Sequence, residues 1–251
     1  MVVLCAMCIL MLVIPALLLY IYKVTFFRRM SWALGRMVLF LGLTVAGMKL
    51  VFTYSHWLAV VVWLLLMMSV SVLMTLRSAR LSLRSFLWPM AAGMSVAVLL
   101  TGGMTALAMS GMTEVWDVRF LIPMAGLLTG CVVETCGKAL STYYMGLRYH
   151  GKLYDYLLGN GATQGEALFY FTRRALERAL LPWLSTLSTL VIGTTPLMMW
   201  GALMAGASLK MAVVLQVVAL LASLCSSIVA VIVALFVARR FAFDAYLRLK
   251  G

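Results

Sequence analysis

Long uninterrupted runs of hydrophobic residues, separated by short polar connections, dominate the pattern along the chain. Each run can cross roughly 30 Å of hydrocarbon as a helix that rises about 1.5 Å per residue. Lipid offers no partners for backbone polar groups, so separate spanning segments must be α-helices. The pattern predicts an all-α polytopic membrane protein with seven transmembrane helices, forming a single transmembrane domain over residues 1–251. The apolar windows lie at about 2–22, 31–53, 57–76, 86–109, 120–146, 181–205 and 211–238.

Composition supports a lipid environment, because 65% of the residues are hydrophobic and only 11% are charged. Soluble domains are nearer to about 45–50% apolar and about 25% charged. The formal net charge of +13 would suggest nucleic acid for a soluble protein. No stretch interleaves basic and aromatic residues on a polar surface, so we expect the lipid bilayer and no nucleic acid as a partner. The first window lacks a basic leader and a cleavage site, and we interpret it as a retained span.

The connections between the windows alternate between basic-rich and basic-poor. The first, third and fifth connections and the tail carry Lys and Arg. The second connection, 53–56, carries neither, and the fourth holds Glu114 and Asp117 with Arg119 behind them. Cytoplasmic loops of membrane proteins collect Lys and Arg, so this alternation predicts an N-terminus outside and a C-terminus inside.

The fifth connection, roughly 147–181, is longer and more polar than the others. We expect it to hold a short helix over 144–158, a Gly-rich corner over 159–161 and then a second helix. Thr163 and Glu166 match a capping box, which satisfies free N–H groups at a helix start. The second helix is amphipathic and leads without a break into the sixth window. Its apolar positions are Leu168, Phe171, Ala175 and Ala179, and its polar arc includes the i,i+4 pair Arg173 and Glu177.

Two interpretations of this amphipathic cytoplasmic segment remain open. It is either an interfacial helix on anionic lipid or a coupling segment that docks to a cytoplasmic partner. Residues 155–161, Asp-Tyr-Leu-Leu-Gly-Asn-Gly, are similar to the E-A-A-x-x-x-G loop of bacterial ABC permeases. That likeness favours the coupling segment.

A wider resemblance, over about residues 30–242, is to the FetB-type iron-export permeases, which include plant permeases linked to aluminium tolerance. Residues 32–36, Trp-Ala-Leu-Gly-Arg, resemble that family's W-x-x-G-R, and residues 122–130 resemble its I-P-x-A-G-M-x-x-G. Residues 161–163, 174–175 and 181–182 resemble its L-G-A-T … R-x-A-L-x-P stretch. Residues 195–201 resemble its L-P-G-M-M-[ST]-G.

The resemblance implies the permease subunit of an ABC transporter in a bacterial inner (plasma) membrane, exporting an iron-like metal ion. It implies a homodimer of permease subunits and a separate ABC ATPase subunit that holds ATP and Mg²⁺. This chain has no G-x-x-x-x-G-K-[ST] phosphate loop, so we expect it to bind no cofactor and to be no enzyme by itself. The coupling-loop residues implied are Asp155, Gly159, Gly161, Ala162, Thr163, Glu166 and Arg174.

Charges within the membrane are costly and mark candidate functional residues. Glu134 and Lys138 are four residues apart on one helix face, where they form either a structural ion pair or part of a translocation path. Further candidates for the path are Cys131, Arg36, Met198 and Met199, and the residues that ligate a metal are left open.

Small residues and prolines in the apolar windows indicate close helix packing and kinks. The Gly126-x-x-x-Gly130 spacing suits either packing within one subunit or a dimer seam. Pro123, Pro196 and Gly201 complete this set. The alternative function is a stand-alone secondary carrier or channel for a small solute, which would use the ion pair and need no ATPase.

Overall fold

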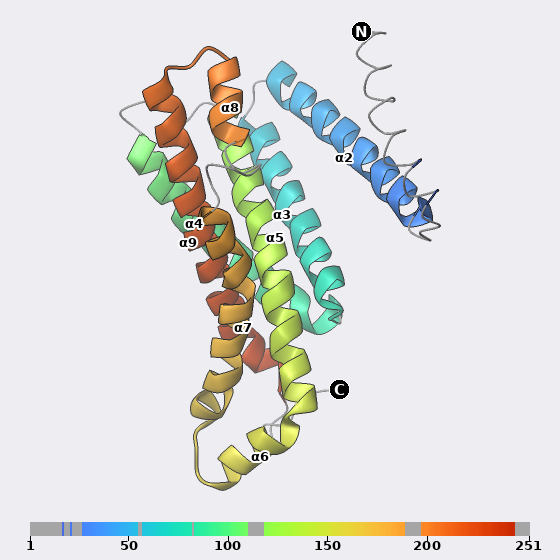
Figure 1. The fold of residues 1–251 in the computed structure, drawn as a ribbon, viewed down its shortest axis with the longest axis vertical. Coiled ribbons are helices and arrows are strands. Elements are labelled where there is room, and N and C mark those ends of the chain that lie inside the picture. The colour runs from blue at the N-terminus through green and yellow to red at the C-terminus, as the bar shows by residue number, and fades with distance from the viewer. Residues whose placement is uncertain are drawn as a thin grey trace. The chain divides into compact units, whose positions relative to one another are not determined.

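The computed structural model describes residues 17, 21, 27–54, 57–81, 83–109, 118–188 and 197–243. Over this part of the chain the structure consists of helices joined by turns, as the sequence predicts (Figure 1). The helices are α2 (Phe27–Tyr54), α3 (Trp57–Ala79), α4 (Leu83–Met109), α5 (Val118–Tyr149), α6 (Gly151–Gly159), α7 (Gln164–Ser188), α8 (Leu197–Met204) and α9 (Leu209–Ala242).

Among the described residues, 5 helices are long and apolar enough to cross a membrane. They cover Ser31–Phe52, Trp57–Ala79, Phe86–Met109, Phe120–Tyr149 and Leu209–Phe241, which correspond to the second to fifth and the seventh predicted windows. The first window, 2–22, lies outside the described residues except for two positions. The sixth window, 181–205, overlaps the end of α7 and all of α8, whereas residues 189–196 lie outside the described part.

The chain divides into two compact units, Met1–Ala59 and Val60–Gly251. Of the first unit, the structure describes mainly α2. In the second unit α9 lies along α4 and α5 and also contacts α7 and α8, and α7 packs against α5. Figure 1 shows α7 running back antiparallel to α5, with α6 at the end where the two helices are joined. The second unit is therefore a helical bundle, and α5, α6 and α7 form a hairpin within it.

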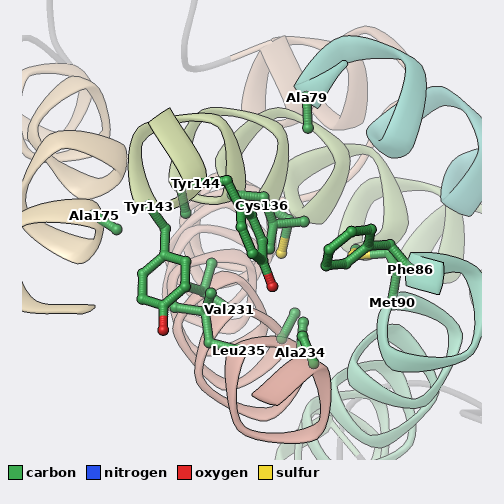
Figure 2. Close-up of a cluster of buried hydrophobic side chains, with 14 of the residues drawn as sticks. Ala79, Phe86, Met90, Cys136, Tyr143, Tyr144, Ala175, Val231, Ala234 and Leu235 are labelled. Atoms are coloured by element: carbon green, nitrogen blue, oxygen red, sulfur yellow. The ribbon is translucent and has the colours of Figure 1, made fainter. Parts of the chain in front are cut away.

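The core of the second unit is formed where α4, α5 and α9 meet (Figure 2). The ring of Tyr144 packs edge-on against Phe86 with centroids 4.8 Å apart, and against Tyr143 at 5.1 Å. Edge-to-face geometry is the favoured arrangement of aromatic pairs. Val231 and Leu235 of α9 belong to the same buried cluster as these rings, and each is 1% exposed. This aromatic and aliphatic layer holds the three long helices together.

The outside of the bundle is largely apolar, and several polar side chains are buried inside it, as expected for a protein surrounded by lipid. Large apolar side chains such as Leu99 (75% exposed) and Leu107 (78% exposed) cover the outside. Several buried threonine hydroxyls donate to carbonyls of the preceding helical turn. Thr101 Oγ1 bonds to the Ala97 oxygen at 2.7 Å, and Thr135 Oγ1 bonds to the Cys131 oxygen at 2.8 Å. Such bonds satisfy polar groups in an environment without water.

One expected boundary is wrong. A separate short helix over 144–158 is not formed, because α5 continues to Tyr149 and α6 begins only at Gly151. Tyr144 and Leu147 are buried in the bundle core, which keeps this part of the chain in the spanning helix. A turn at His150, whose N–H donates to the Gly146 oxygen at 2.9 Å, separates α5 from α6.

Replacing Gly93 tests the close approach of α4 to α9. A Cβ at Gly93 would lie 2.9 Å from the Ala230 oxygen and 3.0 Å from the Ala234 nitrogen, both backbone atoms that cannot move aside independently. We expect Gly93→Ala to destabilise the bundle by about 1–3 kcal/mol through overpacking, seen as a lower melting temperature in detergent.

Gly103→Ala is the matched control, because Gly103 lies on the same helix with no atom within 4 Å of its Cβ position. This variant should be neutral or stabilising by up to about 1 kcal/mol. Equal melting temperatures for the two variants would contradict the close approach of α4 and α9.

Candidate functional site

The corner between α6 and α7 is a compact hydrogen-bonded turn. Gly161 has φ +84, a left-handed conformation that favours glycine. The Gly161 N–H donates to the Leu158 oxygen at 3.0 Å, and the Ala162 N–H donates to the Leu157 oxygen at 3.1 Å. These bonds satisfy the last carbonyls of α6. The predicted Gly-rich corner therefore ends α6 in a defined geometry.

The start of α7 carries the predicted capping box. The Thr163 N–H donates to Glu166 Oε2 at 2.8 Å, and Thr163 Oγ1 also donates to that oxygen at 2.8 Å. The Glu166 N–H donates to Thr163 Oγ1 at 3.4 Å. The hydrogen bonds from Thr163 hold the pKa of the Glu166 carboxyl below its usual value of 4.5. The direction of α7 away from the corner is fixed by this reciprocal set of bonds.

The short helix α6 presents one exposed face and one anchored face. Leu153 and Tyr156 are 41% and 67% exposed, and Asp155 is exposed between them. On the other face Tyr154 is buried, and its ring lies 5.8 Å from that of Phe243, just beyond α9. The helix is therefore held to the bundle while its polar and aromatic face remains uncovered by this chain.

The apolar face of α7 is buried within the chain. Leu168 and Ala175 have no exposed surface, and Phe171 is 3% exposed. A Cβ at Gly146 of α5 would lie 3.3 Å from the Phe171 ring, so α5 and α7 approach closely at this point. On the exposed arc Arg173 Nε donates to Glu177 Oε1 at 2.9 Å, the pair that the spacing predicts. The stripe predicted as amphipathic thus packs on α5.

Glu134 and Lys138 form an ion pair on α5, with Nζ and Oε1 2.7 Å apart. The Lys138 side chain is 45% exposed and the Glu134 side chain 65% exposed. Gly130, one turn earlier, is also exposed and has no atom within 4 Å of its Cβ position. One face of α5 thus carries charge at mid-span without being covered by the described part of this chain.

The other residues predicted for the translocation path have different surroundings. Cys131 is half-buried on α5, one turn before Glu134, and Arg36 is exposed on α2, in the first unit. Met198 lines a largely apolar cavity of about 240 Å³ with Pro123 and Met124. The Met199 N–H, in the first turn of α8, donates to the Gln216 side chain at 3.1 Å.

The residues predicted for packing and kinks also differ in their surroundings. A Cβ at Gly126 would lie 3.1 Å from the Met67 methyl group, so Gly126 faces α3 within the chain. A Cβ at Gly201 would meet no atom within 4 Å, and Pro196 lies outside the described residues. The described ranges contain no group of three or more His, Cys, Asp or Glu that could hold a metal ion.

A cavity of about 550 Å³ between α5 and α7 was not predicted from the sequence. Arg174, predicted as a coupling residue, lines it together with Lys138 and Arg178. Arg174 is ten residues along α7, which places it about 15 Å from the helix start. The i,i+4 spacing of Arg174 and Arg178 is a signal in the sequence, but their position opposite Lys138 follows only from the packing of α7 on α5.

Together, the apolar spans, the outward-facing leucines and the internally bonded hydroxyls define an all-helical multi-pass membrane protein. Residues 2–243 match a protein family described as Uncharacterised protein family (UPF0014), and the chain belongs to this family.

Two relatives give further comparisons. Protein ALUMINUM SENSITIVE 3 of Arabidopsis thaliana is 31% identical over 102 residues, which cover 41% of this chain and 37% of the plant protein. UPF0014 membrane protein slr1647 of Synechocystis sp. is 23% identical over 192 residues, 75% of this chain and 73% of that protein. No solved structure matches the chain significantly.

The capping box makes the corner sensitive to pH. The folded-state pKa of Glu166 is lowered, so its contribution to stability is present above pH 4.5 and is lost as the pH falls through the lower folded pKa. We expect amide exchange in the first turn of α7 to accelerate over this acidic range, as measured by hydrogen–deuterium exchange. Glu166→Gln, the control, should remove this pH dependence; an unchanged profile in that variant would contradict the assignment.

Proposed function

We propose that this chain is the permease subunit of an ABC transporter, and that α6 is the helix on which a separate ATPase subunit docks. The observation that carries the proposal is the exposed face of α6, with Leu153 and Tyr156, displayed at the end of a long helical hairpin. Such a helix fits a groove in a partner protein, where a buried aromatic side chain supplies much of the binding energy. ATP and Mg²⁺ would be held by that partner.

The α5–α6–α7 hairpin is long enough to extend from the membrane into the surrounding water. α5 contains 32 residues and is therefore about 48 Å long, which exceeds the roughly 30 Å of the hydrocarbon core. α7 packs along it at Gly146 and Phe171. A displacement of α6 by ATP-driven movement of the partner would tilt both helices, and the substrate site would then face the other side of the membrane. We propose that α6 and the C-terminus lie inside the cell, because the connections rich in Lys and Arg are expected on that side.

The exposed ion pair on α5 supports a homodimer. A charged pair at mid-span is costly against lipid tails and is found against protein or in a water-filled cavity. In this chain Glu134 and Lys138 stay largely exposed, so we infer that a second copy approaches this face of α5. The neighbouring Gly130 allows close approach of two backbones. The pair would then border the translocation path between two subunits.

We propose export of an iron-like metal ion across a bacterial inner membrane, on the sequence resemblance described above. The name of the Arabidopsis relative links that protein to aluminium. Carboxylate and thiol groups are available on α5 at Glu134 and Cys131, and they suit transient contact with a passing metal ion. A stand-alone carrier is the second candidate, because the exposed ion pair on α5 is also suited to proton coupling.

Replacing Tyr156 tests the docking helix. Tyr156→Ala should reduce co-purification with the proposed ATPase subunit by about tenfold or more, since a hot-spot side chain is removed. Iron-stimulated ATP hydrolysis in liposomes should fall in parallel. Trp200→Ala is the matched control, because Trp200 is 57% exposed on α8, away from α6. Undiminished association of the Tyr156 variant would refute the docking role, and metal transport without any ATPase would establish the carrier.

Replacing Gly130 tests the homodimer. Gly130→Trp adds a bulky ring where the chain itself has open space, so folding should be retained while approach of a second α5 is blocked. We expect the mass in detergent to shift from dimer to monomer, as measured by light scattering. Gly103→Trp on α4 is the control, since its Cβ position is equally open and dimers should persist. A dimer that survives Gly130→Trp would place the interface elsewhere.

A further inference from the structure

The cavity between α5 and α7 combines cationic and hydroxyl side chains in one place. Its volume is about 550 Å³, and its lining includes Lys138 from α5 with Arg174 and Arg178 from α7. Thr142 and Tyr149 of α5 add hydroxyl groups. No acidic side chain is among the lining residues in the described part of the chain. The cavity therefore has a positive lining with hydrogen-bond donors.

The positions of the two arginines follow from the geometry of α7. Arg174 and Arg178 are four residues apart, so they lie one above the other on the same helix face. Arg173, their neighbour, is turned to Glu177 at 2.9 Å and does not line the cavity. Lys138 is held at the opposite wall by Glu134, 2.7 Å from its Nζ. The two guanidinium groups thus face α5 without the carboxylate that neutralises Arg173.

The cavity is amphipathic as well as positive. Phe171, 3% exposed, forms part of its lining between the two helices, and Met145 and Gly146 line it from α5. A phosphate ester matches this pattern, because its oxygen atoms accept bonds from guanidinium and hydroxyl groups while its carbon atoms contact the apolar wall. Basic pockets between transmembrane helices on the cytoplasmic side bind phosphate head groups of lipids.

We propose that this cavity is a binding site for a phosphate-bearing group, with Arg174 and Arg178 as its principal ligands. The bound group joins α5 to α7, so it stabilises the hairpin that carries α6. The phosphate belongs either to an anionic lipid head group or to a soluble phosphate compound, which share this chemistry. The site depends neither on the ATPase partner nor on the metal cargo.

Native mass spectrometry of the detergent-solubilised chain tests the site. Phosphatidylglycerol, phosphatidylcholine and inorganic phosphate are added separately to wild type and to the double variant Arg174→Gln/Arg178→Gln. We expect the double variant to lose the preferred phosphate-bearing probe by about tenfold or more, since charge-assisted hydrogen bonds are removed. Retention of phosphatidylglycerol but not inorganic phosphate by wild type identifies the lipid as the source, and the reverse identifies a soluble ligand.

The charge-matched control is Arg148→Gln/Arg173→Gln, which removes two exposed arginines of the same hairpin that do not line the cavity. This variant should bind the probes as wild type does. Circular dichroism shows whether both variants keep their helix content. Equal binding by the two double variants, or no binding of any phosphate-bearing probe by wild type, overturns the proposal.

Discussion

Helices in lipid gain no hydrophobic free energy by associating, so this bundle depends on close contact between small side chains and on internal hydrogen bonds. Gly93 on α4 meets the backbone of α9 at Ala230, and Gly146 on α5 meets the Phe171 ring of α7. Buried hydroxyls such as Thr101 return their hydrogen bonds to their own helix. The two close approaches join α4 to α9 and α5 to α7 in a chain whose exterior is covered with leucine.

Because lipid offers no partners for polar groups, a charged side chain that stays exposed on this bundle indicates a functional surface. A bundle that hides its hydroxyls and covers its outside with leucine leaves a charged pair open on α5, with Lys138 45% and Glu134 65% exposed. Farther along that helix, Lys138 also borders the cavity that Arg174 and Arg178 line. These groups form a polar track from mid-span toward the α6 end of α5. In the proposed homodimer, a second subunit would cover the exposed ion pair on α5.

The helices and the hairpin corner could be predicted from the sequence because their signals are local. Runs of apolar residues demand helices in lipid, and the spacing of Thr163 and Glu166 specifies a cap whose bonds form as expected. The predicted start of the short helix at residue 144 is wrong, because Tyr144 is buried against Phe86 of α4 and remains part of α5. The α5–α7 cavity and the bond from Met199 to Gln216 depend on helices that meet only in the folded bundle, and no local pattern encodes that meeting.

The contact between Tyr154 and Phe243 connects α6 to a third helix, because Phe243 directly follows α9. α6 is joined covalently to α5 and to α7, and this ring contact adds the far end of α9, which itself lies along α4. Under the proposed mechanism, a displacement of α6 would therefore be transmitted to α9 as well as to α5 and α7. Under the proposed mechanism, bending at the His150 turn alone would not absorb such a displacement, because moving α6 away from the bundle would also break the ring contact.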